Sequence, residues 1–147
     1  MISGLSLWIA GAMLAQGAIA LVLLFIMGAI RLPMVSKGDM RMREIALSRD
    51  PWPEHEKRVS NAFDNQFQLP VLFYVACGLS MGFGTIWIET VLAWAFVLTR
   101  IAHAFVHATR NHVPTRFFFF TAGFAVMGIF WLELLARLFF IAVWNRV

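Results

Sequence analysis

Cysteine and charged residues are both scarce in this chain of 147 residues. The one cysteine, Cys77, excludes an internal disulfide, and its apolar neighbours predict an inert thiol rather than a nucleophile. Charged residues make up 14% of the chain and hydrophobic residues 61%. A soluble domain of this size would have too little polar surface to cover such a core. The composition therefore indicates an all-α integral membrane protein.

No charged residue occurs among residues 1–30, where Gln16 is the only strongly polar side chain. A signal peptide would have a basic start and a shorter apolar core, so we expect a retained transmembrane helix. Apolar runs of about 20 residues, long enough to cross a bilayer, recur along the chain. They predict a single domain, residues 1–147, with a polar loop at about 33–56 and four transmembrane helices at about 5–31, 57–82, 86–109 and 115–144. We expect Pro70 to kink the second helix, since proline removes a backbone donor.

Lysine and arginine are absent from the second connection and from the N-terminal end. The first connection holds more of them than any other part of the chain between helices, and the third holds Arg110 and Arg116. Because basic connections of membrane proteins lie in the cytoplasm, we expect loops one and three there and both termini outside. The net charge of +4 does not suggest a nucleic-acid partner, because the basic residues sit mostly in these short connections.

Several polar residues nevertheless fall inside the apolar runs. Arg100, His103 and His107 have the spacing i, i+3, i+7 and share one helix face. Charge at such depth is costly and by default marks a functional site. Arg116 lies at a helix start, where backbone amides favour an anion. With Arg31 and a polar face of the second helix (Arg58, Asn61, Asn65 and Gln68), these residues predict a basic pocket for a small polyanion, with an apolar co-substrate arriving from the membrane.

Structural roles are open alternatives for the same residues. Arg100 could pair with Glu89 or Glu133, because charges inside a membrane usually find a partner. Glu133 and Arg137 have the i, i+4 spacing of a structural ion pair. The polar face of the second helix could serve only in hydrogen bonds between helices. His103 and His107 have metal-pair spacing, but no third ligand is evident on their helix, so no metal site is expected.

The order and spacing of these polar positions resemble a known family. The marks are four helices in about 150 residues, Arg58 and the run NQFQLP at 65–70 on the second helix, Arg100-x-x-His103, and Pro-Thr-Arg at 114–116. Together they resemble MAPEG, the membrane-associated proteins of eicosanoid and glutathione metabolism, over essentially the whole chain. The likeness is to a divergent, bacterial-looking member, which implies a multi-pass protein of the bacterial inner membrane.

The resemblance implies a homotrimer that binds glutathione near the cytoplasmic side, between subunits. It gives Arg116 the catalytic role of assisting the glutathione thiolate. It also places Arg31, Asn65, Arg100 and His103 at glutathione-contacting positions. With their polar neighbours, the expected glutathione-binding set is Arg31, Arg58, Asn65, Gln68, Arg100, His103 and His107.

The chain departs from the family pattern at four positions. Gln68 stands where many members have glutamate, Asp64 where an arginine is common, and His107 and Phe120 where glutathione-using members have tyrosine. Two hypotheses follow. The first is a glutathione-dependent transferase or peroxidase of lipophilic electrophiles, and the second is a non-catalytic bundle that binds a lipid, an anionic metabolite or a partner protein.

Orientation can be tested by cysteine labelling in a Cys77→Ser background. Arg43→Cys lies in the basic first connection, so a membrane-impermeant maleimide should reach it from the cytoplasmic side only. Ser3→Cys is the matched control, because the same rule puts the N-terminal end outside. Labelling of position 43 from outside would invert the topology and move the predicted pocket to the opposite face.

Overall fold

The computed structural model describes residues 3–38, 40–46 and 48–144, except the side chain of Met42. Within these residues all regular structure is helical, and four helical segments are long and apolar enough to cross a membrane, one of them being Glu54–Phe83. This confirms the all-α, multi-pass membrane architecture. The elements are α1 (Gly4–Ser36), α2 (Met42–Ile45), α3 (Glu54–Asp64), the 3-10 turn η1 (Asn65–Phe67), α4 (Leu69–Phe83), α5 (Trp87–Ala108) and α6 (Val113–Trp144).

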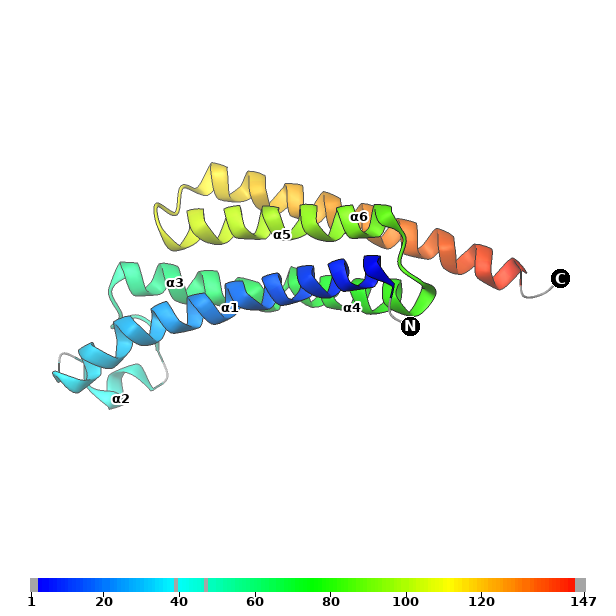
Figure 1. Ribbon diagram of the computed structural model, residues 1–147. Helices are drawn as coiled ribbons and strands as arrows, with labels where there is room; N and C mark the ends of the chain where they lie inside the picture. The colour runs from blue at the N-terminus through cyan, green and yellow to red at the C-terminus, as the bar shows by residue number, and fades with distance from the viewer. Residues whose placement is uncertain (1–2, 39, 47, 145–147) are drawn as a thin grey trace.

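The helices form an elongated bundle (Figure 1). The hairpin of α5 and α6 lies along α1 and the α3–α4 segment, and α5 contacts α1, α3, α4 and α6. Two apolar clusters fill the interior. One surrounds the stacked rings of Phe73 and Phe96, whose centroids are 4.8 Å apart, and the other includes Leu23 and Val59.

Helix α1 continues past its expected end at about residue 31, so that Pro33 lies inside the helix rather than after it. The proline stays close to the C-terminus, where its own carbonyl accepts from the amide of Lys37 (3.0 Å) and from Ser36 Oγ (3.1 Å). Both bonds satisfy one of the carbonyls that a helix end leaves without partners. On its inner side α1 uses small residues, because Gly11 lies against Trp94 of α5.

The second crossing is broken, which corrects the prediction of one continuous helix kinked at Pro70. Helix α3 ends at Asp64, η1 follows, and Gln68 leaves helical geometry with φ −101° and ψ −101° before α4 begins. Pro70 falls in the first turn of α4, where a missing N–H costs nothing. The break turns Gln66 inward, and Gln16 of α1 donates to its side chain at 3.0 Å.

A buried polar network holds the end of the bundle at the α4–α5 turn. Glu89, fully buried, accepts hydrogen bonds from Ser80 Oγ (2.8 Å) and the Ile86 amide (2.9 Å) and forms an ion pair with Arg137. Arg137 also donates to the carbonyls of Phe83 and Gly84. The expected Glu133–Arg137 contact exists at 3.9 Å, but the closer partner of Arg137 is Glu89. The Glu89–Arg137 pair is structural, since the two side chains neutralise each other's charge.

Close packing of α5 on α6 depends on Gly123. A Cβ built at this residue would lie 2.8 Å from Thr99 Oγ1, and that hydroxyl is held by its own bond to the carbonyl of Phe96 (2.7 Å). Real Cβ contacts are not so short, so any larger residue must displace the Thr99 hydroxyl from its hydrogen bond or push the two helices apart. The missing side chain therefore sets the distance between the helices that carry the polar residues of the predicted pocket.

We expect Gly123→Ala to lower the free energy of unfolding by about 1–3 kcal/mol, the usual cost of overpacking. Gly128→Ala on the same helix is the matched control, because nothing lies within 4 Å of its added Cβ. Thermal unfolding in detergent should show a lower Tm for Gly123→Ala only. Thr99→Ala combined with Gly123→Ala should recover much of the loss, and a double variant no more stable than the single one would contradict the contact.

Candidate functional site

Arg100 is the centre of the polar group between α5, α6 and η1. On α5, Val97 belongs to one apolar cluster and Ala104 to the other, so the arginine lies between the two. Its side chain is completely buried. Nη2 donates to both the backbone carbonyl and the side-chain oxygen of Asn65, each at 3.2 Å. A continuous α-helix would direct that carbonyl along its own axis, and the break after Asp64 releases it toward Arg100.

Arg100 has no carboxylate partner within the described residues. The predicted alternative of a structural pair with Glu89 is not what the structure contains, because Glu89 pairs with Arg137. The Nε and Nη1 atoms of Arg100 are buried and make no hydrogen bond to the described part of the chain. A buried cation in this condition is costly, since a desolvated charge needs an anion or a full set of acceptors. The Nε and Nη1 atoms of Arg100 are therefore available to donate hydrogen bonds to an anion.

His103 and His107 continue the same face of α5 toward the cytoplasmic end predicted from sequence. Both are buried, and their rings meet edge to face with centroids 5.5 Å apart. The ring of Phe120 on α6 lies 6.0 Å from that of His103. Neither histidine has a hydrogen-bond partner for Nδ1 among the described residues. The two imidazoles thus add further unpartnered polar atoms to the neighbourhood of Arg100.

Arg116, in the first turns of α6, completes the group. Its Nη1 donates to His107 Nε2 at 2.9 Å and to Asn111 Oδ1 at 2.8 Å. A guanidinium can only donate, so His107 must accept through Nε2 and carry its proton on Nδ1. Both bonds use Nη1, which leaves Nε and Nη2 of Arg116 with no partner among the described side chains. The arginine is thereby positioned while part of its donor set stays available.

The structure brings five of the eight predicted residues together: Asn65, Arg100, His103, His107 and Arg116. The other three make contacts elsewhere. Arg31 donates to the buried carboxylate of Glu56 at 2.6 Å, and its guanidinium lies 4.9 Å from the ring of Trp52. Arg58 donates to Glu54 and to the carbonyl of Thr109. Gln68 is exposed at the helix break.

Sequence reasoning missed two polar residues near this group, Gln66 and Asn111. On a continuous helix, Gln66 would not lie on the predicted polar face. In the structure, the helix break turns its side chain toward the interior. Asn111 adopts a left-handed conformation with φ 49°, which asparagine tolerates better than most residues, and this directs the chain from α5 into α6. The signal for Asn111 was its place in a short turn two residues before Val113.

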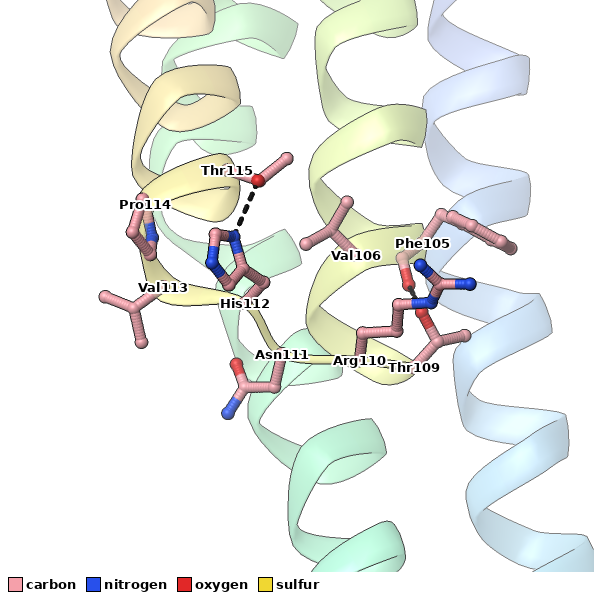
Figure 2. Close-up of a pocket in the computed structure, with 9 residues that line it drawn as sticks. All are labelled: Phe105, Val106, Thr109, Arg110, Asn111, His112, Val113, Pro114 and Thr115. Atoms are coloured by element: carbon pink, nitrogen blue, oxygen red, sulfur yellow. Dashed lines mark hydrogen bonds between the residues drawn. The ribbon is translucent and has the colours of Figure 1, made fainter.

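The turn between α5 and α6 is hollowed, and the residues that line the hollow end at Thr115, one residue before Arg116. Figure 2 shows the lining side chains, among them His112, whose Nδ1 lies 2.8 Å from Thr115 Oγ1. The hollow has a volume of about 870 Å³. A smaller, more polar hollow of about 380 Å³ lies between the start of α3 and the same turn, and Lys57, Arg58 and Arg110 line it. This end of the bundle therefore presents basic side chains beside the α5–α6 turn.

Metal ligands do not gather at this site. Across residues 3–38, 40–46 and 48–144, no three histidine, cysteine, aspartate or glutamate side chains are placed to hold a metal ion. The polar group is instead rich in donors, with two arginines and two histidines. Such a set suits an anionic ligand with several acceptor atoms.

Comparisons with known proteins agree with this architecture. The model of the MAPEG family matches residues 9–136, which cover all four membrane-length helices in whole or in large part. Comparison with curated proteins and with solved structures gave no match. The matched span includes every residue of the polar group described above. The chain therefore belongs to the MAPEG family of integral membrane proteins.

Proposed function

We propose that this protein is a glutathione-dependent transferase or peroxidase that acts on lipophilic electrophiles. MAPEG members include enzymes of this kind. The proposed site is the polar group of the buried residues Arg100, His103 and His107 and the half-buried residues Asn65 and Arg116. By family resemblance we place it in the cytoplasmic half of the bundle and between subunits of a homotrimer, in a bacterial inner membrane. The lipophilic co-substrate would arrive from the bilayer, into which the exposed apolar side chains extend.

The observation that carries the proposal is the incomplete bonding of Arg100. A fully buried guanidinium with two unpartnered nitrogens is stable only if something supplies negative charge or acceptors. Within the described residues no carboxylate does so. Glutathione carries carboxylates and amide carbonyls, and carboxylates form the strongest hydrogen bonds with arginine. The unpartnered atoms of Arg100 and of the two histidines thus fit this ligand.

Arg116 suits the thiol end of the same ligand. Glutathione would supply a thiol, which reacts as the thiolate. An arginine and a helix N-terminus each stabilise a thiolate, and Arg116 provides the first close to the start of α6. Its Nη1 is anchored by His107 and Asn111, so the remaining donors are held in place before any ligand binds.

A second candidate function is a non-catalytic bundle that binds a lipid, an anionic metabolite or a partner protein. One observation favours it: part of the donor set of Arg116 is already taken by His107 and Asn111. A site whose arginine serves mainly to hold its neighbours would bind an anion without activating a thiol. The two functions differ in whether bound glutathione ionises.

Thiolate absorbance of bound glutathione across pH separates the two functions. A free thiol has a pKa of about 8.5, and we expect the wild-type protein to form thiolate below pH 8. Arg116→Ala should move this onset to higher pH by about one pKa unit, equivalent to about 1.4 kcal/mol. Arg116→Lys keeps the charge but loses the planar donor set, so it should be partly impaired.

Arg110→Ala is the matched control for this measurement, because it removes an exposed arginine from the same turn and should leave the titration unchanged. If the wild-type protein binds glutathione without forming thiolate below pH 8, the catalytic role fails and the binding function is preferred.

Arg100 should govern binding rather than ionisation. We expect Arg100→Met to weaken glutathione binding at least about tenfold, a loss of about 1.4 kcal/mol or more, measured by isothermal titration. Its thermal stability should change little, because the substitution removes a buried charge that lacks a counter-charge as well as two hydrogen bonds. Arg137→Met is the contrasting variant: it leaves Glu89 buried and unpaired, so it should cost about 3–5 kcal/mol of stability. An Arg100→Met protein that binds normally but unfolds more easily would make Arg100 structural.

A further inference from the structure

An apolar groove runs between α1 and α5 on a different side of α5 from the buried polar group. It has a volume of about 580 Å³, within the usual range of ligand pockets, and is lined by small and aliphatic side chains: Ala15, Ala18, Val22, Ile26, Ala104 and Ala108. The groove-lining residues of α5 are Ile101, Ala104, Phe105 and Ala108, whereas Arg100, His103 and His107 occupy the neighbouring face. The groove is therefore separate from the proposed thiol site.

The groove leads into the basic end of the bundle. Phe105 and Thr109 line both the groove and the hollow at the α5–α6 turn, so the two adjoin. In Figure 2 the side chains of Phe105 and Arg110 lie on the side of α5 that faces α1. Arg110 is exposed and forms no ion pair or hydrogen bond with the described residues through its side chain. Arg58 donates to the carbonyl of Thr109, which brings a second guanidinium to the same rim.

We propose that this groove is a binding site for an anionic phospholipid, with one acyl chain between α1 and α5 and the phosphate headgroup at Arg110. Charge complementarity carries the choice of occupant. The walls offer almost no polar atoms, which suits hydrocarbon, and an arginine without an ion-pair partner stands where the groove meets the polar end. Basic pockets between transmembrane helices bind anionic headgroups on the cytoplasmic side of membranes. A zwitterionic lipid would place its own cation beside Arg110, whereas the charge of Arg58 is already paired with Glu54.

The site differs from the glutathione site in what it recognises. The lipid would be held by Arg110 and by hydrocarbon contacts, with no part taken by Arg100, His103 or Arg116. Its occupancy therefore does not depend on the proposed function, and the variants that test it leave the buried polar group unchanged.

Native mass spectrometry of the detergent-solubilised protein can test the proposal with phosphatidylglycerol and phosphatidylcholine of identical acyl chains. The wild-type protein should retain phosphatidylglycerol preferentially. Arg110→Gln should reduce that preference about fivefold, the factor expected for one basic residue near an anionic lipid. Arg43→Gln is the matched control. It removes an exposed arginine of α2, which is far from Arg110 in the sequence, and should leave the preference unchanged.

Filling the groove should abolish binding of both lipids. Ala18→Leu fills the groove from α1 and Ala108→Leu fills it from α5, so the test does not depend on one variant folding. Equal retention of the two lipids, or an equal loss in Arg43→Gln and Arg110→Gln, would overturn the headgroup assignment. Cross-linking of Ala18→Cys to a neighbouring copy by a photoactivatable maleimide, in a Cys77→Ser background, would show that a second copy covers the groove and would also overturn the proposal.

Discussion

The contact between Arg100 and Asn65 is the interaction on which the rest of the site depends. A completely buried guanidinium needs acceptors, and the helix break supplies a backbone carbonyl and a side-chain amide at 3.2 Å. The break in turn follows from Pro70, which is tolerated in the first turn of α4 but not in the middle of a regular helix. Gly123 allows α6 to approach close enough to cover the arginine, since its missing Cβ leaves room for Thr99. Pro70 and Gly123 together therefore determine the surroundings of the buried Arg100 side chain.

The two ends of the bundle use buried charge in different ways. At the α4–α5 turn, Glu89 and Arg137 neutralise each other, and nearby hydroxyls and carbonyls complete their hydrogen bonds. Around Arg100 the balance is one-sided, with two arginines and two histidines and no carboxylate in contact among the described residues. Polar groups that satisfy one another stabilise a fold, whereas unpartnered buried donors are expected where a ligand binds. This difference, and not burial alone, separates the structural pair from the candidate site.

Sequence reasoning predicted the helical membrane architecture and the face shared by Arg100, His103 and His107, because both follow from local periodicity. It also placed Arg116 near these residues, because the predicted topology puts the end of the third helix and the start of the fourth on the same side of the membrane. It was wrong about the continuity of the second crossing, because periodicity cannot show whether a proline kinks a helix or begins a new one. It also left open whether Arg100 pairs with Glu89, since that depends on which residue lies at the same depth in the bundle. The separation of Arg31 and Gln68 from the buried group could not be read from spacing either.

The sequence by itself determined the membrane class, the approximate helices and the identity of the polar residues within them. Those properties depend on hydropathy and on a 3.6-residue period, which act over a few turns of chain. Only the tertiary structure decided which charges neutralise each other: Glu89 was taken by Arg137 and Glu56 by Arg31, and Arg100 was left to Asn65. The physical reason is that Coulomb and hydrogen-bond energies depend on distances between helices, which are set by packing at residues such as Gly123 and Pro70 that carry no charge.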